Sequence, residues 1–326
     1  MNPKVVFLPL NYGSVVQDGV YDAFREAGCQ LEVFDYFTIY LNNKSHRRVR
    51  DRLIEVCKKF QPDLVHCQIQ HTNIIDAKTL QEVKSKCPKA IITNWTGDVR
   101  NYVPPTFRRI ASVADYNLIS STGQMDFFKR GLSRPVKYWQ IGFNPKLYNP
   151  AAQPPNRFDY DCCFTGHHNT KEKYPGAPTR VEMCQKMRNT FGNRFLLHGD
   201  NWPRHLRSKG SLNQRELMRV YQRSTAILSV SHYNDIAHYF SDRLLMCLAS
   251  GRPTVALRFP KWESYFTDGC DLMIANDLDD MVQKVKYLKA NPEHANFIGQ
   301  QGAAKVMAEH TYLSRVNELL DMVGLR

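Results

Sequence analysis

The clearest signal of the fold is the stretch Tyr239-Phe-Ser-Asp-Arg-Leu-Leu-Met-Cys-Leu-Ala-Ser-Gly-Arg-Pro-Thr-Val-Ala-Leu257. Ser241 suits the N-cap of a helix, and Asp242 in the first turn complements the helix dipole. Apolar residues have helical spacing over 242–249, and a Gly-x-Pro turn then leads into an apolar run at 254–257 that is typical of a buried strand. Helix, glycine turn and strand in this order predict one αβ unit of a parallel sheet.

The same alternation continues toward both ends of the chain. In the first half it predicts strands at 5–10, 31–34, 64–67, 91–94, 116–120 and 137–139, with helices such as 19–27 and 49–60. In the second half it predicts strands at 160–165, 194–198, 226–230, 254–257 and 271–275, and helices at 180–190, 214–223, 242–249 and 279–290. A last helical pattern runs over 295–323.

The chain of 326 residues is too long for one ordinary core. Four prolines over 145–157 mark the best linker. We therefore predict an α/β protein of two Rossmann-like domains that face a central cleft. An N-terminal domain would span 1–150 and a second domain 151–300. The helix over 301–326 could return to the N-terminal domain.

Charge and cysteine content bear on partners and compartment. The net charge is +13, of which residues 1–150 carry +8, and its densest run over 45–52 suits either an anionic partner or a solvated helix face. The nine cysteines form no C-x-x-C pair, which favours reduced core thiols. No apolar run approaches the roughly 18–20 residues of a membrane span. These features predict a cytoplasmic protein, in the host cytoplasm if a phage encodes it.

Four segments carry a resemblance to a known family. In order they are Tyr239–Leu257, Glu263-Ser-Tyr-Phe-Thr-Asp-Gly269, Asp277-Leu-Asp-Asp280 and His310-Thr-Tyr-Leu-Ser-Arg315. The succession resembles the C-terminal domain of group-1 glycosyltransferases, above all the CgeB-like branch. The resemblance implies a GT-B architecture, a nucleotide-sugar donor such as a UDP- or GDP-sugar on the C-terminal domain, and no further cofactor.

Local chemistry and the resemblance together predict the donor site. The start of the helix at Ser241 and Asp242 offers free N–H groups to a diphosphate, and Arg243 could contact a phosphate bidentately. The resemblance places the nucleotide base near Gly210 and Leu212. A glycine turn could let a ligand approach the backbone at Gly166 and His167. The same holds at Gly13 and Ser14, where an ordinary tight turn is an equal alternative. The adjacent histidines 167 and 168 point apart on an extended chain, and no third ligand has a recognised spacing, so we predict no metal site.

The chain departs from the family at two positions. The family carries two glutamates eight residues apart, and here His238 and Met246 stand in their places. The second glutamate normally binds the donor ribose. Asp242 could substitute for it, or the chain could be an inactive binding protein, and the stereochemical outcome stays open.

Candidate catalytic residues and the acceptor come from the first half. Asp98 follows a buried strand and would be the general base of an inverting enzyme, although it could equally cap a turn. In a retaining enzyme His71 or backbone groups would support the oxocarbenium-like state. The positive charge suits DNA, an anionic lipid or an acidic glycan. Phage DNA glucosyltransferases share the GT-B architecture, so a hydroxymethylated DNA base is one acceptor we consider. A nucleotide-sugar or glycan binding protein without catalysis is the alternative, and the oligomeric state is left open.

Overall fold

The computed structural model describes residues 2–11, 17–69, 73–100, 102–148, 158–169 and 174–326. The chain divides into two compact units. Unit 1 consists of Met1–Ile141 with Tyr312–Arg326, and unit 2 consists of Gly142–Thr311. These bounds differ from the expected ones at 150 and 300, and most of the expected linker lies outside the described residues.

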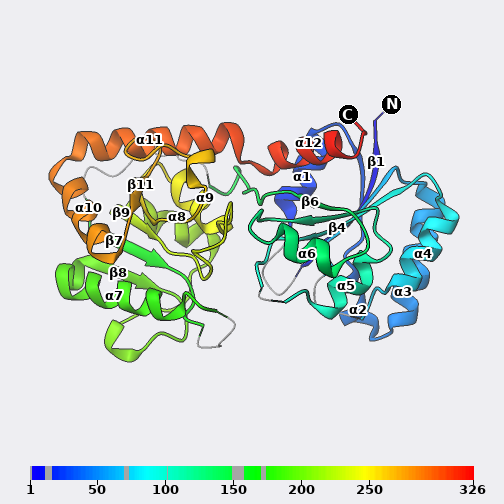
Figure 1. Ribbon diagram of the computed structural model, residues 1–326, viewed down its shortest axis with the longest axis horizontal. Helices are drawn as coiled ribbons and strands as arrows, with labels where there is room; N and C mark the ends of the chain where they lie inside the picture. The colour runs from blue at the N-terminus through cyan, green and yellow to red at the C-terminus, as the bar shows by residue number, and fades with distance from the viewer. Residues whose placement is uncertain (1, 12–16, 70–72, 101, 149–157, 170–173) are drawn as a thin grey trace. The chain divides into compact units, whose positions relative to one another are not determined.

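Unit 1 is built on a six-stranded parallel sheet with the order β2-β1-β3-β4-β5-β6 (Figure 1). The strands are β1 (Lys4–Leu8), β2 (Gln30–Val33), β3 (Leu64–Cys67), β4 (Ile91–Thr96), β5 (Tyr116–Ile119) and β6 (Val136–Tyr138). The helices are α1 (Asp18–Glu26), α2 (Tyr36–Asn43), α3 (His46–Phe60), α4 (Ala77–Lys86), α5 (Pro105–Ala111), α6 (Met125–Gly131) and α12 (Tyr312–Met322). All six strands predicted in this half are present, with ends shifted by at most two residues.

Side chains alternate across this sheet and meet helices on both faces. Val6 and Leu8 belong to a core with α3 and α4. Val5 and Phe7 belong to the opposite core, with α1 and α12. The indole Nε1 of Trp139 also donates to the carbonyl of Arg315, 2.7 Å away. The C-terminal helix is therefore an integral part of unit 1, next to α1 (Figure 1).

Unit 2 is built on a five-stranded parallel sheet with the order β11-β10-β9-β7-β8 (Figure 1). The strands are β7 (Tyr160–Thr165), β8 (Phe195–His198), β9 (Ser224–Ser229), β10 (Thr254–Leu257) and β11 (Met273–Ala275). The helices are α7 (Ala177–Phe191), α8 (Gln214–Gln222), α9 (Asp242–Ala249), α10 (Leu278–Ala290) and α11 (Pro292–Glu309). Core residues of α7 and α10 share one cluster, and those of α8 and α9 contribute to another.

The single helix expected over 295–323 is wrong, because α11 and α12 are separate helices. The break falls at His310 and Thr311. The carbonyl of His310 accepts from the amide of Phe143, 3.2 Å away, and Thr311 forms an isolated bridge with Phe143. Backbone pairing with a distant segment thus interrupts an apolar pattern that contains neither proline nor glycine at this point.

Three smaller expectations can be compared with the structure. Asp277 accepts from the amide of Asp280 at 2.8 Å, so its reading as a helix cap is confirmed. Eight of the nine cysteines are buried, and none of the nine forms a disulfide. Among the described residues, no helix combines the length and the apolar character that crossing a membrane requires.

Candidate functional site

The candidate site lies at the carboxyl ends of β7 and β9 in unit 2. The chain leaves β7 toward β8 on one side of the sheet and later enters β9 on the other side. Neighbouring strands whose connections leave in opposite directions open a crevice, and ligands of such sheets bind there. Residues that follow these two strands, Gly166 and His232, lie at this crevice together with the start of α9.

Arg243, in the first turn of α9, contributes one cation to the crevice. Its guanidinium carbon lies 5.6 Å from the ring centre of Phe164. A Cβ at Gly166 would come within 3.2 Å of that carbon, so glycine leaves room for the guanidinium there. The Arg243 side chain has no hydrogen-bond or ion-pair partner among the described residues. A half-buried guanidinium of this kind is available for an anion.

Arg180, on α7, contributes a second cation against the same ring. Its side chain is 2 % exposed, and its guanidinium carbon lies 5.7 Å from the ring centre of Phe164. Nε donates to the carbonyl of Val230 at 2.9 Å. Burial, and then the nearby charge of Arg243, lower the pKa of Arg180 to about 8. The two guanidiniums repel each other, and a bound anion would relieve that repulsion.

His232 supplies a neutral hydrogen-bond donor beside the two arginines. Its Nε2 faces Nη1 of Arg180 at 2.6 Å and Nδ2 of Asn169 at 3.2 Å. Because guanidinium can only donate, Nε2 must accept, and the proton is assigned to Nδ1. Burial, reinforced by the charges of Arg180 and Arg243, lowers the pKa of His232 to about 3. Within the described part of the chain, the buried Nδ1 finds no partner.

Close backbone packing fixes the floor of the crevice. The carbonyl of Gly166 accepts from Nε1 of Trp202 at 2.8 Å. Gly199 has a φ of +126°, and a Cβ on it would lie 1.9 Å from the carbonyl oxygen of Gly166. Only glycine fits at position 199, since a side chain there would displace the turn that follows β7.

The other expected donor residues of unit 2 border the crevice or lie near it. His167 is exposed and accepts from the amide of Asp200 at 3.2 Å. The carbonyl of Gly210 accepts from the amide of Gly199 at 2.8 Å, and Leu212 is half-buried two residues further on. Ser241 is the N-cap of α9 but makes no side-chain capping bond.

The start of α9 offers fewer free amides than expected. The carboxylate of Asp242 accepts from the amide of Arg243 at 2.8 Å, and the amide of Leu244 donates to the carbonyl of Ser241 at 3.0 Å. The positive character of the crevice therefore comes mainly from the two guanidiniums.

The two positions at which the family carries glutamate have unequal surroundings. Nε2 of His238 lies 3.1 Å from the hydroxyl of Ser264. The backbone of His238 has a φ of +57°. Met246 is half-buried and packs on the core cluster that contains Cys163 and Tyr221. Met246 therefore serves packing.

The expected residues of unit 1 are described only in part. Asp98 is exposed just after β4, and its carboxylate accepts from Nη2 of Arg100 at 2.8 Å. Gly13, Ser14 and His71 lie outside the described residues. No group of three or more histidine, cysteine, aspartate or glutamate side chains in the described ranges could hold a metal ion.

Sequence reasoning missed Arg180 and His232. An arginine within a helical pattern indicates a solvated face, and nothing in the periodicity reveals that Arg180 is buried. His232 had a usable signal, because it follows the end of β9 by a few residues, as Gly166 follows β7.

Comparisons with known proteins agree on the fold. Residues 180–321 match the family model described as "Glycosyl transferase-like". A sequence search of curated proteins gives no match. A glycosyltransferase structure from Rickettsia africae shares 13% identity over 99% of this chain and 98% of its own, with a TM-score of 0.67. This is the GT-B fold.

Two further GT-B structures cover the whole chain. Sucrose-phosphate synthase from Thermosynechococcus elongatus shares 12% identity over 99% of both chains, with a TM-score of 0.63. Anabaena HepE in complex with UDP and glucose shares 12% identity over 99% of this chain and 100% of its own, with a TM-score of 0.62. At these identities the likeness establishes the GT-B fold and no individual site.

Proposed function

We propose that this protein transfers a sugar from a nucleotide-sugar donor whose diphosphate lies against Arg243 and Arg180. The observation that carries the proposal is the pair of guanidiniums on Phe164, without a carboxylate partner in the described residues, at the switch point of a parallel sheet. A diphosphate supplies the two negative charges that this pair lacks.

The same groups suit the chemistry of transfer. When the bond between sugar and diphosphate breaks, negative charge builds on the leaving phosphate. Two positioned guanidiniums stabilise that charge. The match over 180–321 to a glycosyl transferase-like model, and the HepE complexes with UDP and UDP-glucose, support a UDP-sugar as the first donor to test.

Asp98 is our candidate base, and its pairing with Arg100 would have to open before it accepts a proton. The excess positive charge of the first 150 residues favours an anionic acceptor. DNA with hydroxymethylated bases is one acceptor to compare with an acidic glycan and an anionic lipid.

A binding protein without catalysis is the second candidate function. The position of Met246 favours it, since the residue expected to bind ribose is absent and its replacement packs on the core. Release of UDP from UDP-glucose, with and without acceptor, separates the two functions. A catalyst turns the donor over, whereas a binding protein only holds it.

The decisive experiment measures the stability of the free protein and the binding of UDP and GDP in Arg243→Met. Methionine keeps an apolar stem on Phe164 and removes the charge. We expect the melting temperature of the free protein to rise, because the repulsion with Arg180 is gone. We expect UDP affinity to fall by about ten- to a hundredfold, the worth of a charge-assisted hydrogen bond.

Arg219→Met is the matched control, since Arg219 is exposed on α8 and loses the same charge. This variant should leave the melting temperature and the UDP affinity unchanged. Equal UDP affinity in wild type and Arg243→Met would remove the site assignment. Absence of binding by any nucleotide to the wild type would remove the proposed function.

A further inference from the structure

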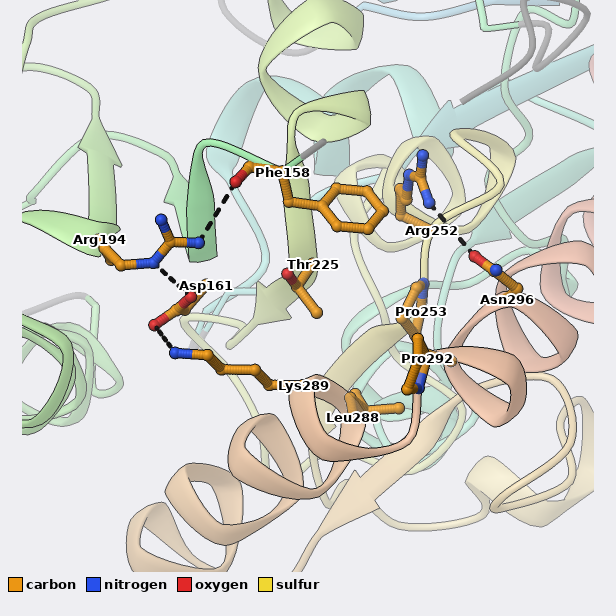
Figure 2. Close-up of a pocket in the computed structure, with 11 residues that line it drawn as sticks. Phe158, Asp161, Arg194, Thr225, Arg252, Pro253, Leu288, Lys289, Pro292 and Asn296 are labelled. Atoms are coloured by element: carbon orange, nitrogen blue, oxygen red, sulfur yellow. Dashed lines mark hydrogen bonds and ion pairs between the residues drawn. The ribbon is translucent and has the colours of Figure 1, made fainter. Parts of the chain in front are cut away.

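A cavity of about 300 Å³ lies at the amino ends of β7, β9 and β10, at the opposite edge of the unit 2 sheet from the crevice (Figure 2). A six-residue strand separates the two edges by about 20 Å. Its lining combines apolar and charged side chains, among them Phe158, Asp161, Arg194, Arg252, Leu288 and Lys289. The cavity belongs wholly to unit 2 and shares no residue with the crevice at the carboxyl ends of β7 and β9.

Arg252, in the turn between α9 and β10, is the unusual member of this lining. Its side chain is 1 % exposed, and its Nε and Nη2 have no partner among the described residues. Nη1 lies 3.5 Å from Oδ1 of Asn296, at the limit of a hydrogen bond. Figure 2 shows the guanidinium between this amide and the ring of Phe158, whose centre is 4.4 Å from the guanidinium carbon.

The one carboxylate in the lining is already engaged. Asp161 accepts from Nε of Arg194 at 2.6 Å and from Nζ of Lys289 at 2.9 Å, as the dashed lines in Figure 2 mark. The lining therefore carries three cations and one anion. Burial lowers the pKa of Arg252 to about 10, so it stays charged at neutral pH.

A buried charge without a partner is unfavourable, and an oxyanion would remove that penalty. Other features of the cavity suit an organic anion. Phe158, Leu288 and Pro253 provide apolar surface, and α11 begins at Pro292 with the positive end of its dipole at the cavity. The volume equals that of about ten water molecules in the liquid, enough for a small metabolite.

We propose that this cavity binds a small organic anion whose phosphate or carboxylate group pairs with Arg252. The anion replaces Oδ1 of Asn296 at the guanidinium, and the exposed amide of Asn296 rotates to donate through Nδ2. The planar or apolar body of the ligand lies on Phe158 and Leu288. Binding here is independent of the nucleotide-sugar.

Asn296→Asp tests this site by supplying the missing counter-charge within the protein. The probes are phenyl phosphate, benzoate and inorganic phosphate, titrated calorimetrically, with benzyl alcohol as the neutral probe. Gln301→Glu adds the same charge on the same helix at an exposed position outside the lining, and is the matched control.

We expect the wild type and Gln301→Glu to bind phenyl phosphate or benzoate equally, and both more tightly than inorganic phosphate or benzyl alcohol. Asn296→Asp should bind about ten- to a hundredfold more weakly. It should also melt a few degrees higher without ligand, because the new carboxylate pairs with Arg252. The tighter of the two aromatic probes identifies the oxyanion. Unchanged affinity in Asn296→Asp, or no binding of any charged probe by the wild type, would overturn the proposal.

Discussion

Each edge of the unit 2 sheet has an arginine against a phenylalanine ring, but the surroundings of the two pairs differ. At the carboxyl edge the guanidinium of Arg243 lies over the ring of Phe164, and at the amino edge that of Arg252 lies over the ring of Phe158. Both guanidiniums lack a carboxylate partner in the described residues. The carboxyl edge adds a second arginine, Arg180, whereas the amino edge adds Asp161 with its two cations. A glycine of positive φ lies beside the arginine at both edges, Gly166 and Gly251, so the second guanidinium is the main difference between the proposed nucleotide site and the proposed small-anion site.

The glycine turns provide the largest expected effect. Gly199→Ala places a Cβ 1.9 Å from the carbonyl oxygen of Gly166, so the backbone after β7 has to move. We expect the free energy of unfolding to fall by about 3 kcal/mol or more, from the clash and the left-handed backbone together. Chemical denaturation of the full chain measures this loss.

Gly210→Ala is the matched control, because Gly210 has a φ of +78° and open space around its Cα. It pairs with Gly199 in an isolated bridge. Alanine at position 210 would be strained only by the left-handed backbone, so we expect the free energy of unfolding to fall by about 1 kcal/mol. Equal losses in the two variants would show that the close approach at the carboxyl edge is not required.

The second effect concerns how the two edges respond to pH. The pKa of Arg180 is lowered to about 8 in the free protein, and a bound diphosphate should raise it. Above pH 8 binding must therefore take up a proton, and the affinity for UDP falls as pH rises. Between pH 7 and pH 9 we expect a loss of about tenfold.

Calorimetric titrations with UDP across this range test the expectation. Arg180→Met should bind UDP more weakly and lose the pH dependence. Arg252 keeps its charge up to about pH 10, so phenyl phosphate at the amino edge should bind equally at pH 7 and pH 9. A pH dependence of UDP binding that survives in Arg180→Met would assign it to another group.

The sequence predicted the fold more completely than the candidate site. Local signals were sufficient for α9 and β10, where a cap residue, helical spacing and a Gly-x-Pro turn agree. They failed at His310 and Thr311, where pairing with Phe143 ends a helix that the pattern continues. The break depends on a contact between residues far apart in sequence, so periodicity could not reveal it.

The site was predicted less completely, for the same reason. Arg243 could be predicted as a site residue because its helix start has a signal, whereas Arg180 is held in place by Val230 and His232, about 50 residues away in the chain. The cavity at the amino edge was not predicted at all. Arg252 lies between glycine and proline in a turn, and only the folded chain places Phe158 against it.

The smallest expected effect is at the amino edge. Lys289→Met removes one of the two cations on Asp161, while Arg194 stays 2.6 Å from that carboxylate. The side chain of Lys289 is about half exposed, so solvent screens the pair. We expect the free energy of unfolding to change by no more than about 1 kcal/mol in thermal or urea denaturation. A loss well above this value would mean that Arg194 alone cannot hold Asp161. The cation excess of the amino edge would then serve the fold, and the comparison with the carboxyl edge would weaken.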